Sequence, residues 1–191
     1  MIIIAILGDI GSGKSFASKL FGHPVFNADE IVKRIYLKDK KCFYDLKKKF
    51  PVYIKSFPIN KTELLKLILS NKNNLSKINK IVHPIVRKKL NIFLNKNKKK
   101  RLVILDIPLI LENRIMIKKC IFVYIHSEKK IKYKRLIKRP GYNSKLFKII
   151  KKSQLPLLYK RKMSKYIIKN NYKKNTVKEQ IELIKKEIFN L

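Results

Sequence analysis

The chain has 191 residues, of which 46% are hydrophobic and 31% charged, and its formal net charge is +36. This length allows one domain with a small insertion, and the hydrophobic fraction excludes a disordered tail. The charge suggests nucleic acid or an anionic membrane as a partner. However, 41 of the 48 basic residues are Lys, and Lys, Asn and Ile, which share A/T-rich codons, fill 86 positions. We therefore attribute the charge to composition and expect no specific nucleic-acid partner.

The cysteines and the N-terminal segment indicate a soluble protein of the cytoplasm. Cys42 and Cys120 lie far apart and lack the paired Cys or His spacing of a disulfide framework or a zinc site. The apolar run 2–7 is too short for the core of a signal peptide. No stretch approaches the roughly 18 uncharged apolar residues of a membrane span. We expect no membrane association, and either a monomer or a weak homo-oligomer is compatible with the sequence.

Apolar runs rich in β-branched residues alternate with helical patterns along the chain, which predicts an α/β fold with a parallel sheet covered by helices. The predicted strands are 2–7, 24–27, 102–106, 120–125 and 165–169. Helical spacing of apolar residues follows Pro84, which we expect in a first turn, and recurs from Val177 to Ile188. Residues 38–82 contain two or three helical pieces and no convincing strand, so we expect a helical insertion that holds the substrate.

Residues 8–15 read Gly-Asp-Ile-Gly-Ser-Gly-Lys-Ser, the G-x-x-x-x-G-K-[ST] phosphate loop, between an apolar strand and a helical pattern. Glycines let successive amides point at phosphate oxygens, and the start of the helix adds the positive end of its dipole. We expect Lys14 to reach the β and γ phosphates of ATP and the Ser15 hydroxyl to bind Mg²⁺. The expected ATP-binding residues here are Gly8, Gly11, Ser12, Gly13, Lys14, Ser15 and Phe16.

The apolar strand 102–105 ends in a carboxylate, Asp106. In nucleotide-binding α/β folds the carboxyl ends of the strands border the ligand crevice. Asp106 is therefore expected to face the same Mg²⁺ or its waters, beside the substrate. The alternative is an Asp that caps the following loop.

Two classes of nucleotide-binding protein fit this sequence poorly. A guanine-specific GTPase is expected to carry Asn/Thr-Lys-x-Asp, and none of the Asn-Lys pairs has an Asp two residues later. A nucleic-acid-binding ATPase usually needs a longer chain, and seven Arg are few for base and phosphate contacts. A small-molecule kinase remains, and the phosphate loop alone leaves a nucleoside or a sugar open as acceptor.

The order of the motifs resembles that of the dephospho-coenzyme A kinase family through most of the chain. The phosphate loop is similar to the family's Gly-Gly-Ile-Gly-Ser-Gly-Lys-Ser, and Asn27-Ala28-Asp29 to its Asp-Ala-Asp. The other similar segments are Ile81-Val82-His83-Pro84, Asp106-Ile107-Pro108-Leu109-Ile110-Leu111-Glu112, Arg135-Leu136-Ile137-Lys138-Arg139, Gln154, Lys160-Arg161 and Ile167-Ile168-Lys169-Asn170. Residues 38–75 match least well. The departures are Leu7 for Thr, Asp9 for Gly, Asn27 for an acid and Ser164-Lys165 for Ala-Asp.

The resemblance implies that residues 1–191 form a single P-loop kinase domain with a parallel five-stranded sheet flanked by helices. Within it, residues 38–82 would be a helical acceptor-binding insertion and residues 128–155 a helical lid. The implied reaction is phosphorylation of the ribose 3′-hydroxyl of dephospho-coenzyme A by ATP, with Mg²⁺, to give coenzyme A and ADP. Another small-molecule kinase activity is the alternative.

The resemblance also implies roles for individual residues. Asp29 would accept the hydroxyl proton, since Asn27 replaces the second acid, although an N-cap is an equally good local explanation. Arg135 and Arg139 would close over ATP, or lie on a solvated helix face. His83 would shape the coenzyme side of the cleft, or form a structural turn before proline. The expected catalytic residues are Asp29, Lys14 and Arg139, the substrate-binding ones Asp29, His83 and Asp106, and the metal ligands Ser15 and Asp106.

Overall fold

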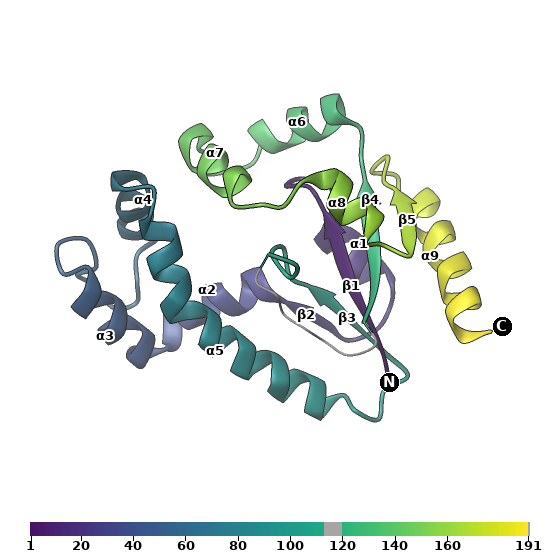
Figure 1. Cartoon of the computed structure of the whole chain (residues 1–191), viewed down its shortest axis with the longest axis horizontal. Helices are drawn as coiled ribbons and strands as arrows, with labels where there is room; N and C mark the ends of the chain where they lie inside the picture. Colours follow the sequence, from purple (N-terminus) through teal and green to yellow (C-terminus); the bar gives the residue numbers. More distant parts are fainter. Residues whose placement is uncertain (113–119, 191) are drawn as a thin grey trace. The chain divides into compact units, whose positions relative to one another are not determined.

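The computed structural model describes residues 1–112 and 120–190 (Figure 1). The strands are β1 (Ile2–Gly8), β2 (Val25–Asn27), β3 (Leu102–Asp106), β4 (Cys120–His126) and β5 (Tyr166–Lys169), which confirms all five predicted strands. The helices are α1 (Lys14–Leu20), α2 (Ala28–Lys38), α3 (Lys40–Lys49), α4 (Lys61–Ser70), α5 (Asn74–Lys96), α6 (Lys129–Ile137), α7 (Ser144–Lys152), α8 (Leu157–Lys162) and α9 (Lys174–Phe189). Within these described ranges, no helix is both long and apolar enough to cross a membrane.

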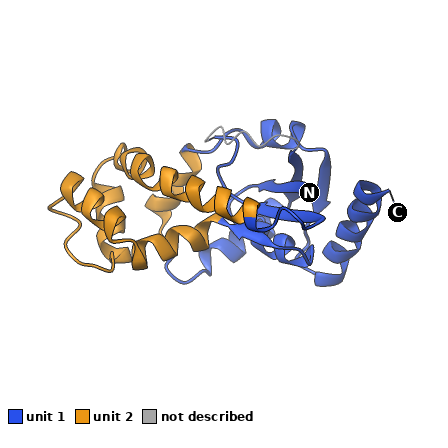
Figure 2. Ribbon diagram, turned by 90° about the horizontal axis from the view of Figure 1, so that it is seen from below, with its two compact units in different colours: residues 1–27, 96–142, 153–191 blue, residues 28–95, 143–152 orange. Residues whose placement is uncertain are grey.

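The chain divides into two compact units (Figure 2). The first consists of Met1–Asn27, Lys96–Tyr142 and Ser153–Leu191, and it contains the sheet. The second consists of Ala28–Asn95 and Asn143–Lys152, and its described elements are helices. The segment 38–82 lies wholly in the second unit and has helices and no strand, as the sequence predicts.

The sheet of the first unit is parallel throughout, with the strand order β2-β3-β1-β4-β5. Ile2 lies opposite Leu102 at the start of β1 and β3, and Asn27 lies opposite Asp106 at the end of β2 and β3. Because the strands run in one direction, their carboxyl ends share one edge of the sheet. The phosphate loop, which follows β1, therefore begins at the same edge as Asn27 and Asp106.

The core of the first unit follows from the period-two alternation of its strands. Ile4 and Ile6 of β1 belong to one buried cluster with Ala17 of α1 and with Phe21, which caps the C-terminus of that helix. The C-terminal helix α9 adds a stripe at helical spacing to the same cluster, made of Val177, Ile181 and Ile184. The alternate residues Ile3, Ala5 and Leu7 are also buried, so both faces of β1 are covered, as in other parallel sheets.

Two helices of the second unit, α3 and α4, begin at polar caps. The Asp39 side chain accepts a hydrogen bond from the Cys42 backbone N at 2.9 Å at the start of α3. Asn60 accepts one from Thr62 N at 2.8 Å at the start of α4. Such caps satisfy backbone donors that have no partner within the helix. They give these two helices defined starts.

The prediction that Pro84 occupies a first turn is wrong, and so is the alternative of a turn at His83. Both residues lie inside the continuous helix α5. An interior proline removes one helical hydrogen bond and costs about 3 kcal/mol. However, Ile78, Val82, Val86 and Leu90 form a buried stripe on both sides of Pro84, which is itself exposed. Four buried apolar side chains, each worth about 1.5–3 kcal/mol, outweigh that cost.

Candidate active site

Two glycines of the phosphate loop occupy positions that admit no side chain. Gly8 has φ +150°, and a Cβ on it would lie 2.7 Å from Ser12 Oγ and 2.8 Å from the Ile125 carbonyl oxygen. Gly13, the N-cap of α1, has φ +90°, and a Cβ there would collide with Asn170 Nδ2. The loop geometry therefore requires these glycines for space as well as for their backbone conformation.

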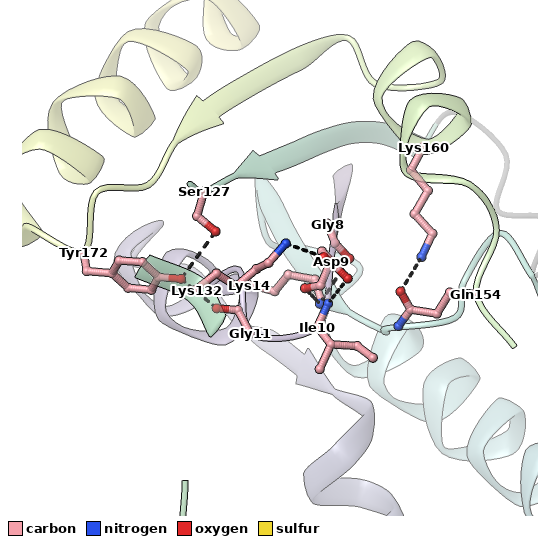
Figure 3. A network of polar contacts seen from close by, with 10 residues as sticks. All are labelled: Gly8, Asp9, Ile10, Gly11, Lys14, Ser127, Lys132, Gln154, Lys160 and Tyr172. Carbon is pink, nitrogen blue, oxygen red and sulfur yellow. Dashed lines mark hydrogen bonds and ion pairs between the residues drawn. The ribbon is translucent and has the colours of Figure 1, made fainter. Parts of the chain in front are cut away.

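The Lys14 ammonium lies against its own loop (Figure 3). Its Nζ donates to the carbonyl oxygens of Gly8 at 3.2 Å and Asp9 at 2.8 Å, and the side chain is buried. Ser12 Oγ is also buried and has no hydrogen-bond partner in the described part of the chain. A positive charge and a hydroxyl donor are thus held within the loop. Ser15 is exposed, whereas Phe16 packs against the core of the first unit.

The segment after β5 braces the phosphate loop. Asn170 is 3% exposed; its Nδ2 donates to the Ser12 carbonyl oxygen at 2.8 Å, and its Oδ1 accepts from Tyr172 N at 2.8 Å. The Tyr172 hydroxyl donates to the Gly11 carbonyl oxygen at 2.8 Å, and Tyr172 has φ +65°, which is uncommon for a residue with a side chain. Two consecutive carbonyls of the loop therefore point toward this segment, away from the bound phosphates that the loop motif predicts.

Sequence reasoning missed Tyr172 altogether and gave Asn170 no role. The two braces join residues 158 and 161 positions apart. Neither hydrophobic periodicity nor a local motif can predict a contact between residues so far apart in the sequence. The sequence offered one indication of a turn here. Asn-Asn-Tyr follows the last predicted strand directly, and Asn is common in turns because it tolerates the left-handed backbone conformation.

Asp106 lies at the end of β3 and is 2% exposed. Its Oδ2 accepts a hydrogen bond from Asn27 Nδ2 at 2.9 Å, and the two residues are direct partners across β2 and β3. An acid at position 27 would place two like charges opposite each other, which destabilises a strand pair. Asn27 contributes a donor in place of that second charge. The predicted placement of Asp106 at the same sheet edge as the phosphate loop follows from this register.

Asp29 lies in the first turn of α2, beside Glu30, and is exposed. Since α2 begins at Ala28, the carboxylate lies inside the first turn, where it interacts favourably with the helix dipole. Asp29 belongs to the second unit, two residues along the chain from Asn27 of the first.

The two predicted lid arginines have different surroundings. The Arg135 guanidinium on α6 lies over the Tyr172 ring, with Cζ 4.3 Å from the ring centroid, a cation–π contact. Arg139 follows the end of α6; its backbone N donates to the Leu136 carbonyl oxygen at 3.1 Å and its side chain is exposed. Helix α6 belongs to the first unit and α7 to the second, so the predicted lid segment 128–155 contributes to both.

His83 lies half-buried in α5, in the second unit. Burial lowers the pKa of its imidazole, and the positive charge of Arg87, one turn further along, lowers it again. The imidazole is therefore neutral at pH 7 and presents one donor and one acceptor.

A buried ion pair joins two further segments of the first unit. Lys160 Nζ lies 2.6 Å from Glu112 Oε1, and the two side chains are 1% and 9% exposed. Glu112 Oε1 also accepts from Leu155 N at 3.0 Å, and Lys160 Nζ donates to Gln154 Oε1 at 3.4 Å. A buried charge needs this degree of pairing. The pair ties the segment that follows β3 to α8, the helix that contacts β1.

A parallel sheet with this strand order, a G-x-x-x-x-G-K-[ST] loop between β1 and α1, and an Asp at the end of the neighbouring strand define a P-loop kinase. A sequence model described as dephospho-CoA kinase matches residues 2–176. A dephospho-CoA kinase of Wolbachia pipientis wMel is 34% identical over 186 residues, which are 95% of each chain. The chain belongs to the dephospho-CoA kinase family.

Two solved structures have the same fold. The crystal structure of TT1252 from Thermus thermophilus superposes with a TM-score of 0.79 at 26% identity, and the match covers 100% of this chain and 97% of the other. The dephospho-CoA kinase from Campylobacter jejuni superposes with a TM-score of 0.64 at 22% identity, covering 97% and 96%. The predicted α/β fold with a five-stranded parallel sheet is thereby confirmed.

Proposed function

We propose that this protein transfers the γ-phosphoryl group of ATP to the ribose 3′-hydroxyl of dephospho-CoA, giving CoA and ADP. The observation that carries the proposal is the braced phosphate loop of residues 8–15 in a chain that belongs to the dephospho-CoA kinase family. Phosphoryl transfer depends chiefly on positioning and on electrostatic stabilisation, so a rigid loop that presents amides and a lysine suits it.

The phosphate loop would hold ATP by its β and γ phosphates. Lys14 already lies within the loop, hydrogen-bonded to two of its carbonyls, and would turn toward the phosphates when they bind. The buried Ser12 hydroxyl would donate to a phosphate oxygen. Arg135, stacked on Tyr172, would place its charge beside the loop, and Arg139 would neutralise charge on the transferred group.

The residues present fit Mg²⁺, which prefers oxygen ligands and keeps several of its waters. The Ser15 hydroxyl and the buried Asp106 carboxylate would hold it, and both belong to the first unit. Asn27 donates to that carboxylate without adding charge, so the Asp106 side chain keeps its affinity for a cation. When bound, the ion would neutralise negative charge on the β and γ phosphates.

Asp29 would act as the general base. It would accept the proton of the 3′-hydroxyl as that oxygen attacks the γ phosphorus, while the bond from γ phosphorus to the bridging oxygen breaks and ADP leaves. Its exposure leaves the carboxylate accessible to an acceptor. The helices of 38–82, with His83 on α5, would bind the acceptor, and the lid segment 128–155 would cover ATP.

The proposal is tested by coupled ADP release with dephospho-CoA, nucleosides and sugars as acceptors. We expect turnover with dephospho-CoA and little with the others. Asp29→Asn should lower kcat by about 10² to 10⁴ while ATP still binds, because a positioned base is lost. Lys14→Ala should weaken the use of ATP with any acceptor. Preferential turnover of a nucleoside or a sugar would refute the proposed acceptor.

A further inference from the structure

The phosphate loop carries a negative charge of its own at Asp9. This residue is 8% exposed and lies in the loop between Gly8 and Ile10. Its Oδ1 accepts from the Ile10 backbone N at 2.7 Å, and its carbonyl oxygen accepts from Lys14 Nζ and from Ser12 N. Its position is thus fixed from within the loop. A carboxylate there opposes the binding of phosphates, whose charge has the same sign.

Lys132 of α6 pairs with this carboxylate (Figure 3). The contact joins Lys132 Nζ to Asp9 Oδ2, and the side chains are 15% and 12% exposed. Both residues belong to the first unit. Because the pair is largely shielded from water, its charges attract more strongly than they would on an open surface, where such pairs contribute little.

Helix α6 touches the phosphate loop through one face. A Cβ on Gly11 would lie 3.4 Å from Lys132 Cγ and 3.7 Å from a methyl carbon of Leu136, so both side chains pass close to the loop. Arg135, which lies between them on the helix, stacks on Tyr172, and the Tyr172 hydroxyl donates to the Gly11 carbonyl oxygen. Residues three and four apart share a helical face. The three contacts therefore converge on the turn of the loop from Asp9 to Gly11.

We propose that Lys132 is a positioning residue for ATP that acts through Asp9: it neutralises the acid of the phosphate loop and holds α6 against that loop. This inference rests on the proposed function, since it presumes that the loop binds a nucleotide. Without Lys132, the Asp9 carboxylate would stay fixed by Ile10 N and would repel the phosphates. The helix that carries Arg135 would also lose one of its three contacts beside the loop.

The test compares ATP affinity in four proteins by titration calorimetry without an acceptor: the wild type, Lys132→Met, Asp9→Gly and the double variant. We expect Lys132→Met to weaken ATP binding about tenfold, which corresponds to about 1.4 kcal/mol. The double variant should return to within about threefold of the wild type, because the uncompensated acid is gone. Lys134→Met is the matched control, since it removes the same charge from the exposed face of the same helix and should change affinity by less than about twofold.

Two results would overturn the inference. Unchanged ATP affinity in Lys132→Met would show that the pair does not assist binding. A double variant as weak as Lys132→Met would show that Lys132 acts on the nucleotide directly and not through Asp9. Lys132→Gln supplies a second neutral variant if the methionine variant does not fold. Since calorimetry requires no acceptor, a wild type that binds ATP but ignores dephospho-CoA would refute the proposed function and leave this inference standing.

Discussion

Replacing Asn170 by Ala tests whether the segment after β5 holds the phosphate loop in shape. The change removes two hydrogen bonds of 2.8 Å and leaves the buried Ser12 carbonyl oxygen and the half-buried Tyr172 backbone N without these partners. An unsatisfied buried group costs about 1–3 kcal/mol and a half-buried one less, so the free energy of unfolding should fall by about 1–4 kcal/mol. Urea denaturation followed by circular dichroism measures this loss. KM for ATP should also rise, because the Ser12 carbonyl is then free to turn inward.

Two further variants separate the parts of this effect. Asn170→Asp keeps the oxygen that accepts from Tyr172 N but loses the donor to Ser12, so it should raise KM for ATP nearly as much as alanine does. Asn171→Ala is the control: it removes exposed hydrogen bonds of the same turn and should cost less than about 1 kcal/mol. Equal, small effects of Asn170→Ala and Asn171→Ala on stability and on KM would show that the hydrogen bonds of Asn170 do not hold the phosphate loop in shape.

Three other changes probe different parts of the molecule. Arg139→Ala should lower kcat well beyond any loss of stability and Arg139→Lys should recover only part of it, as steady-state kinetics will show; full activity of the alanine variant would make Arg139 a surface residue only. Because burial lowers the pKa of His83 below its usual 6.5, the unfolded chain takes up the proton first, and the free energy of unfolding should fall as the pH drops below about 6.5. Urea titrations at pH 7 and about pH 5.5 should show a smaller fall in His83→Gln than in the wild type. An equal fall in the two proteins would contradict this. Ile181→Ala should cost about 2–5 kcal/mol on thermal unfolding, against less than about 0.5 kcal/mol for the exposed Leu183→Ala.

Local patterns in the sequence predicted the sheet and the phosphate loop well. Each strand is a short apolar run, and the loop motif requires a strand before it and a helix after it, so both are encoded by neighbours in the chain. The error at Pro84 arose where tertiary packing of α5 overrode a local preference. The bonds from Asn170 and Tyr172 to the loop escaped prediction because their partners are more than 150 positions away. Asp9 was noticed only as a departure from a family motif, and its partner Lys132 stands in a run of lysines that look alike in sequence.

The hydrogen bonds from the segment after β5 also constrain when the nucleotide site is completed during synthesis. The loop of residues 8–15 leaves the ribosome more than 150 residues before Asn170 and Tyr172, which orient its carbonyls. Contacts between such distant residues form late, since the chain between them has to be ordered first. A nascent chain from which β5 and the residues after it have not yet emerged therefore carries the glycines and the lysine of the loop without the hydrogen bonds that orient the loop carbonyls. We therefore expect ATP to stabilise the chain only after β5 and the residues that follow it have joined the sheet.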